Sequence, residues 1–104
     1  QIGKGFLRSH GVIINPESDV QDFSIINCRS TIGHNVTISE FSIISGHVFI
    51  GGSCFIGSRT LIGPGANIMH ATRVGNNVVV SIGACVARKI PDGKTTIPKL
   101  SKYI

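Results

Sequence analysis

Tryptophan is absent from this 104-residue chain, tyrosine occurs once, and there are only two glutamates, three leucines and four alanines. Because glutamate, leucine and alanine favour helices, their scarcity argues against a helical bundle, a coiled coil or an ordinary doubly wound α/β domain. No apolar run reaches the roughly 18 residues of a transmembrane helix, so no membrane span is predicted. The chain also lacks the interleaved basic and aromatic residues of many nucleic-acid-binding proteins, so nucleic acid is a poor candidate partner.

Cysteine pairs of the CxxC type are absent too. The three cysteines, Cys28, Cys54 and Cys85, are odd in number and scattered, which predicts reduced thiols in a cytoplasmic protein rather than disulfides or a zinc site. Charged residues make up only 14% of the chain, so we expect a folded domain rather than disorder. The only methionine is Met69, so we expect the chain to be trimmed or part of a longer protein.

Isoleucine, valine and glycine are abundant, and their order is periodic. Stepping six residues at a time from Ile2 to Val86 meets fifteen positions, of which fourteen are isoleucine or valine and only Arg8 differs. The position four further along is small, and the one directly after the aliphatic residue is often glycine. Each unit predicts a short strand whose aliphatic side chain points inward, followed by a tight corner where glycine and asparagine supply the positive φ angles. Such short units must stack to bury anything.

Hexads such as residues 56–61 (IGSRTL) and 62–67 (IGPGAN) resemble the hexapeptide repeat of left-handed parallel β-helix acyltransferases. Residues 80–91 resemble that family's closing coil, which ends in a basic residue and an Ile-Pro step. The resemblance implies an all-β fold in which three hexads form one triangular coil. It predicts about five coils of 18 residues over residues 1–91, followed by a short tail over residues 92–104.

Within that family, the segments VIIN (12–15), IIN (25–27) and GHNVTISEF (33–41) are similar to sugar O- and N-acetyltransferases of the NeuD/PglD type. The resemblance implies transfer of acetyl from acetyl-CoA to a sugar amine or hydroxyl, with His34 as general base and Asn35 beside it. It also implies that the Gly52 backbone N–H stabilises the thioester oxyanion. Further acetyl-CoA contacts are predicted at Pro64, Ile82 and Lys89.

The same resemblance predicts the assembly and the context. It implies a homotrimer with sites between subunits, a sugar or nucleotide-sugar acceptor, and a role in surface polysaccharide biosynthesis. Full-length relatives carry an N-terminal nucleotide-sugar domain, so we expect this chain to be the catalytic part of a longer enzyme. Two departures are visible: Asn35 stands where the family usually has Asp or Glu, and Ile43 stands where it has a second histidine.

Spacing adds geometry, because residues 18 apart share a face of such a solenoid. His34, Gly52 and His70 therefore fall in one corner column. Imidazole suits proton abstraction near neutral pH, and a glycine N–H suits an oxyanion. Five of the ten basic residues lie in the last 17 positions, either to hold phosphates of coenzyme A or as a solvated cap.

Two other functions remain open at this point. A metal enzyme of the γ-carbonic-anhydrase type needs three histidines, two of them spaced H-x-x-x-x-H, and the four histidines at positions 10, 34, 47 and 70 offer no such pair. We therefore predict no metal site. A non-catalytic scaffold would fit the replacements at Asn35 and Ile43.

Overall fold

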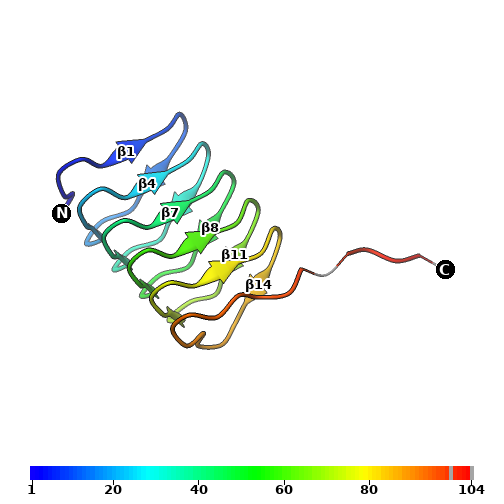
Figure 1. Ribbon diagram of the computed structural model, residues 1–104. Helices are drawn as coiled ribbons and strands as arrows, with labels where there is room; N and C mark the ends of the chain where they lie inside the picture. The colour runs from blue at the N-terminus through cyan, green and yellow to red at the C-terminus, as the bar shows by residue number, and fades with distance from the viewer. Residues whose placement is uncertain (99, 104) are drawn as a thin grey trace.

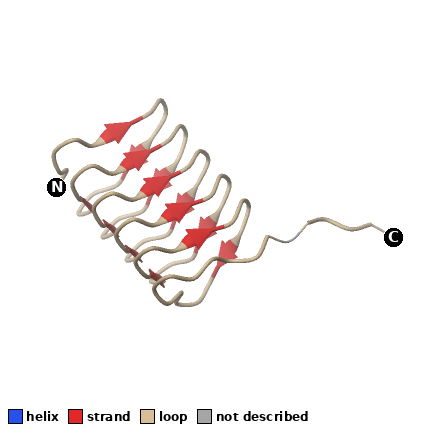
Figure 2. Cartoon of the chain, viewed as in Figure 1, coloured by secondary structure: helices blue, strands red, loops and turns tan. Residues whose placement is uncertain are grey.

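The computed structural model describes residues 1–98 and 100–103, and these form fourteen two-residue strands and no helix (Figures 1 and 2). No helix among the described residues could therefore cross a membrane. The strands stack in parallel into three sheets, which form the three sides of a prism that measures 47 × 28 × 21 Å including the tail.

Each sheet collects every third strand of the chain. In spatial order, sheet I contains β1 (Leu7–Arg8), β4 (Ile25–Ile26), β7 (Ile43–Ile44), β10 (Leu61–Ile62) and β13 (Val79–Val80). Sheet II contains β14 (Cys85–Val86), β11 (Asn67–Ile68), β8 (Phe49–Ile50), β5 (Thr31–Ile32) and β2 (Ile13–Ile14). Sheet III contains β12 (Arg73–Val74), β9 (Phe55–Ile56), β6 (Thr37–Ile38) and β3 (Asp19–Val20).

The pairing register confirms the predicted repeat of three hexads. Ile26 pairs with Ile44 and Ile44 pairs with Ile62, each partner standing 18 residues further along the chain. The fold is a left-handed parallel β-helix, as predicted. It has slightly fewer than five complete coils, because the hexad at Ile2 forms only an isolated bridge to Val20 and no strand.

The aliphatic position of each hexad fills the interior. Ile26, Ile44 and Ile62 are fully buried, and the equivalent residues from Val20 to Val80 are at most 1% exposed. Each such side chain contributes roughly 1.5–3 kcal/mol when fully buried, so the stacked column is the main source of stability. Arg8 breaks the pattern in the first coil, where no preceding coil covers it and it is exposed.

Where the small position carries a hydroxyl, that hydroxyl has a role that the sequence pattern did not reveal. The Ser42 hydroxyl donates to the Gly57 carbonyl at 2.6 Å and accepts from the Thr60 N–H at 3.3 Å. Thr60 repeats this one coil later, donating to the Gly75 carbonyl at 2.7 Å. These hydroxyls therefore pair with backbone N–H and C=O groups buried inside the corners. Such backbone groups would be costly to leave without a hydrogen bond.

The predicted role of the glycines that follow the aliphatic residues is wrong. Positive φ falls two residues later, at Gly5, Gly11, Glu17, Phe23, Arg29, Asn35, Phe41, His47, Ser53, Arg59, Gly65, Ala71, Asn77, Gly83 and Gly93. The glycines directly after the aliphatic residues are required by close approach between coils instead. A Cβ on Gly33 would lie 2.7 Å from the Gly52 nitrogen, and one on Gly51 would lie 2.8 Å from the His70 nitrogen.

The outer face of sheet I is uniformly apolar. The first residue of each strand points outward, and in sheet I these residues form an aliphatic ladder of Leu7, Ile25, Ile43, Leu61 and Val79. Four of the five are 38–62% exposed. Sheets II and III instead mix apolar, polar and charged residues at the same positions. The prism therefore has one distinct apolar side.

The first residues of the predicted tail complete the last coil. The Asp92 carboxylate accepts from the Asn76 N–H at 2.8 Å, and the Thr96 hydroxyl accepts from the Ser81 N–H at 2.8 Å. Beyond this point the chain runs away from the prism in an extended path (Figure 1). The domain boundary at residue 91 stays a prediction.

Candidate active site

The corner that joins sheet II to sheet III carries the predicted catalytic residues, and we name it the histidine corner. Its successive coils contribute residues 15–18, 33–36, 51–54, 69–72 and 87–90. The Ser53 N–H donates to the His34 carbonyl at 2.9 Å, and the Ala71 N–H donates to the Gly52 carbonyl at 2.9 Å. His34, Gly52 and His70 therefore lie in consecutive coils of one column, as the spacing predicted, with both histidines exposed.

The two imidazoles flank an open space above Gly52. A Cβ built on Gly52 would lie 3.6 Å from Nδ1 of His70 and 3.9 Å from Nδ1 of His34. Both ring nitrogens thus lie within 4 Å of a single point. Any side chain at position 52 would occupy that point, so glycine leaves room for an external group.

The Gly52 N–H is a free donor, whereas three N–H groups at the same hexad position elsewhere are capped. At the corner between sheets III and I, three N–H groups two residues after the aliphatic position, those of Lys4, Ser58 and Asn76, are capped by a side chain from the next coil. Ser58 N–H donates to Asn76 Oδ1 at 2.8 Å, and Lys4 N–H donates to Asp22 Oδ1 at 2.9 Å. The histidine corner has no Asp or Asn at these positions, and among the described residues the Gly52 N–H has no hydrogen-bond partner.

Asn35 is not hydrogen-bonded to His34 in the described part of this structure. It occupies a corner position with φ of 58°, and its N–H donates to the Pro16 carbonyl at 3.3 Å. No hydrogen bond links its side chain to His34 within the described part of the chain. Its predicted catalytic part stays a prediction.

The predicted cofactor residues lie on the two corners that flank sheet II. Pro64 and Ile82 occupy one column of the corner between sheets I and II, where the Gly83 N–H donates to the Pro64 carbonyl at 2.8 Å. Ile82 lines a groove of about 490 Å³, and Lys89 lines an adjoining groove of about 390 Å³. Both grooves include Cys85 of β14, so the two residues face a shared surface at the end of sheet II.

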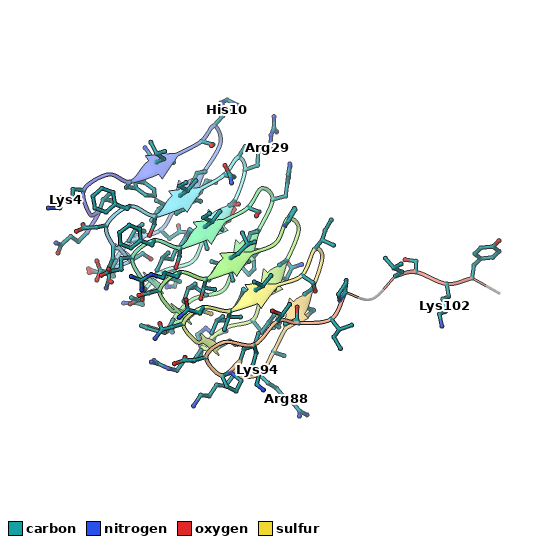
Figure 3. The ribbon with its side chains drawn as sticks, in the orientation of Figure 1. Lys4, His10, Arg29, Arg88, Lys94 and Lys102 are labelled. Atoms are coloured by element: carbon teal, nitrogen blue, oxygen red, sulfur yellow. The ribbon has the colours of Figure 1, made fainter. Side chains whose placement is uncertain are left out.

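Basic side chains surround this end of the prism. Arg88 and Lys94 extend from the last coil and Lys102 extends from the tail (Figure 3). Lys89 stands in the histidine corner two coils beyond Gly52, which is roughly 10 Å along the prism at the usual strand spacing. An anionic group held at this end would thus lie within reach of a molecule that also extends to Gly52.

The remaining histidines and the cysteines lie elsewhere. His10 and His47 are on the corner between sheets I and II, and His10 stands at the N-terminal end (Figure 3). Cys54 is buried and donates to the Met69 carbonyl at 2.9 Å, and burial raises the pKa of its thiol. The residues that the structure describes contain no cluster of three or more His, Cys, Asp or Glu side chains suited to a metal.

Comparisons with solved structures find the same fold in acetyltransferases. The acetyltransferase domain of PglB from Neisseria gonorrhoeae is 27% identical, with a TM-score of 0.64, over 90% of this chain and 49% of that one. The resemblance to hexapeptide-repeat acetyltransferases is confirmed. No family model matches the chain, and no curated protein matches its sequence.

Two other solved structures share the fold at lower identity. Serine acetyltransferase 1 from Entamoeba histolytica is 19% identical, with a TM-score of 0.79, over 85% of this chain and 39% of that one. The H141A mutant of GDP-perosamine N-acetyl transferase from Caulobacter crescentus, solved with CoA and GDP-perosamine, is 18% identical, with a TM-score of 0.52, over 88% of this chain and 54% of that one. The chain spans about half the length of the acetyltransferase structures it matches.

Proposed function

We propose that this chain is an acetyl-CoA-dependent acetyltransferase acting on a sugar amine or hydroxyl, in a nucleotide sugar or a surface-polysaccharide precursor. The observation that carries the proposal is the free N–H of Gly52, a glycine whose open side lies within 4 Å of two exposed imidazoles, on a fold shared with acetyltransferases.

His34 acts as the general base. It takes the proton from the acceptor amine or hydroxyl while that atom attacks the acetyl carbonyl carbon. The Gly52 N–H donates to the carbonyl oxygen as negative charge develops there. No covalent enzyme intermediate is needed, because the corner can hold both substrates together. Asn35 would support the base through the polarity of the corner.

Acetyl-CoA extends along sheet II from Gly52 toward the C-terminal end. The phosphates contact Lys89 and the neighbouring basic residues, while Pro64 and Ile82 contact the apolar part. This path agrees with the grooves at Ile82 and Lys89. A second structure of the PglB domain contains acetyl coenzyme A; it is 19% identical, with a TM-score of 0.60, over 88% of this chain and 53% of that one.

The acceptor is the less constrained part of the proposal. The Caulobacter protein is a GDP-perosamine N-acetyl transferase, and the Entamoeba protein is a serine acetyltransferase. The NeuD/PglD-like segments around His34 favour a sugar. Thiol release with amino sugars, compared with sugars that have only hydroxyl groups, distinguishes an amine acceptor from a hydroxyl acceptor.

The proposal includes a homotrimer with the site between subunits, located in the cytoplasm. A cyclic trimer uses two different patches of each subunit. The aliphatic ladder of sheet I supplies one patch, since it is a continuous apolar strip that water covers in the monomer. Sheet II, which ends at the histidine corner, supplies the other. The three free cysteines fit a reducing compartment.

The test is a thiol-release assay with acetyl-CoA against a panel of amino sugars, nucleotide sugars and serine. We expect turnover with a sugar and a loss of at least about 100-fold in kcat for His34→Ala. His10→Ala is the matched control, because it removes an exposed histidine from a different corner.

Near-normal turnover by His34→Ala would remove His34 from the mechanism. Turnover with serine and with none of the sugars would show that the acceptor is not a sugar. Failure of the wild type both to release thiol and to bind acetyl-CoA in calorimetry would favour a scaffold instead.

A further inference from the structure

We propose that His70 is a further catalytic residue, donating a second hydrogen bond to the same carbonyl oxygen that the Gly52 N–H stabilises. The inference rests on the proposed acetyl transfer and adds to it a role for the histidine one coil beyond Gly52. Nothing in the hexapeptide pattern itself requires a histidine at that position.

The direction of the Gly52 N–H follows from the equivalent corners. Where the N–H two residues after the aliphatic position is capped, its acceptor comes from the residue one coil later, as for Ser58 with Asn76 and Lys4 with Asp22. The residue one coil after Gly52 is His70. The free N–H therefore points toward the space beside the His70 side chain.

The His70 ring is at the right range to share that space. Its Nδ1 lies 3.6 Å from the point above Gly52, and that point is 3.9 Å from Nδ1 of His34. A carbonyl group bound over Gly52 near that point would therefore lie within reach of both imidazoles as well as of the N–H. His34 serves as base on one side of the oxygen, so His70 is free to donate on the other.

The chemical difference between histidine and asparagine explains why the space stays open. Asn76 presents a carbonyl oxygen that fills the acceptor position and neutralises the donor. An imidazole instead carries an N–H donor on a rigid ring. With histidine at position 70, two donors face an oxygen that must come from a bound molecule.

The reaction balances without another reactant. The acceptor nitrogen or oxygen forms a bond to the acetyl carbonyl carbon, its proton passes to His34, and the carbonyl π electrons move onto the oxygen held by Gly52 and His70. The C=O bond then re-forms, the C–S bond breaks, and its electron pair stays on the coenzyme A sulfur. That sulfur takes the proton from His34, which gives the acetylated acceptor and free coenzyme A.

The test compares His70→Ala with His70→Asn. His70→Ala removes one donor and leaves the Gly52 N–H open, so we expect kcat to fall by about 100-fold with little change in KM. His70→Asn places an amide oxygen where Asn76 caps Ser58, so it removes both donors. Asparagine should therefore be worse than alanine, which is the reverse of the order expected if position 70 needed only bulk or polarity.

Two-dimensional amide NMR gives a readout independent of turnover. In His70→Asn, the Gly52 N–H should exchange more slowly with solvent than in the wild type, because it is capped. Adding acetyl-CoA should shift the Gly52 amide resonance in the wild type and not in His70→Asn. Unchanged melting temperatures for both variants would show that the fold is kept, as expected for an exposed side chain.

The possible results distinguish failure of the His70 proposal from failure of the proposed function. Wild-type kcat in His70→Ala, or equal activity of the two variants with no change in Gly52 exchange, would overturn the role of His70 and leave the proposed function standing. A wild type that does not bind acetyl-CoA, with a Gly52 amide that does not respond to it, would overturn both.

Discussion

Replacing Gly52 by alanine is the most direct test of the site, because it adds one methyl group and removes no donor. The new Cβ would lie 3.3 Å from the His34 carbonyl oxygen, 3.6 Å from His70 Nδ1 and 3.9 Å from His34 Nδ1. Gly52 does not have positive φ, so its backbone accepts alanine without strain. Only the 3.3 Å contact is tight, and a shift of a few tenths of an ångström relieves it.

The expected effect on stability is therefore small. Alanine restricts the unfolded chain and stabilises by about 0.4–1 kcal/mol at a compatible site, which offsets a tight contact of similar size. The net change should stay within about 1 kcal/mol, which corresponds to a change in melting temperature of no more than about 8 °C for a domain of this size.

The expected effect on activity is large. The methyl group occupies the point between the two imidazoles that the reacting carbonyl must reach. The donor stays, but the methyl group keeps the carbonyl oxygen from reaching it; since loss of one oxyanion donor costs about 100- to 1000-fold in kcat, Gly52→Ala should lose at least about 100-fold. The assay is thiol release from acetyl-CoA, with calorimetry for binding and a thermal melt for folding.

Gly46→Ala is the matched control. Gly46 holds the same position in its hexad, and its Cβ would lie 3.5 Å from both the Cys28 carbonyl oxygen and Sγ. It adds the same methyl group on the corner between sheets I and II, where no imidazole lies within 4 Å of the new Cβ. A folded Gly52→Ala protein with activity equal to that of Gly46→Ala would refute the placement of the reaction above Gly52.

Three further predictions concern the fold and the assembly. Ser42→Ala should lower the free energy of unfolding by about 1–3 kcal/mol, because the Gly57 carbonyl loses its buried donor, whereas Ser42→Thr should keep it; urea titration would show no difference between them if the hydroxyl were idle. Ile43→Lys places a charge in the aliphatic ladder and should convert a trimer into monomers in sedimentation, so an unchanged trimer would locate the interface elsewhere. Because Cys54 is buried and its thiol pKa is raised, a thiol reagent should modify two cysteines in the native protein and the third only after unfolding, and three rapid equivalents would contradict this.

The period of six was enough to predict the β-helix and its three-hexad coil. Each strand presents only one inward side chain, so one aliphatic residue per hexad is both necessary and visible in the sequence. The same arithmetic brought His34, Gly52 and His70 into one column, because residues 18 apart must stack in this fold. The period did not predict what happens at the N-terminal end, where no further coil stacks. There Ile2 keeps the aliphatic pattern but forms only an isolated bridge, and Arg8 departs from the pattern and is exposed.

The sequence pattern placed the positive φ angles wrongly and overlooked the hydroxyl bridges. Corner conformation depends on contacts between coils, such as the approach of the Gly52 nitrogen to Gly33, and a repeat read along one chain does not contain them. The free donor at Gly52 is visible only by comparison with capped corners like that of Ser58 and Asn76. The sequence by itself determined the scaffold, because burial of one side chain in six is a local requirement. The tertiary structure alone decided which corner keeps an open N–H between two imidazoles, because that depends on which side chains from neighbouring coils reach the same space.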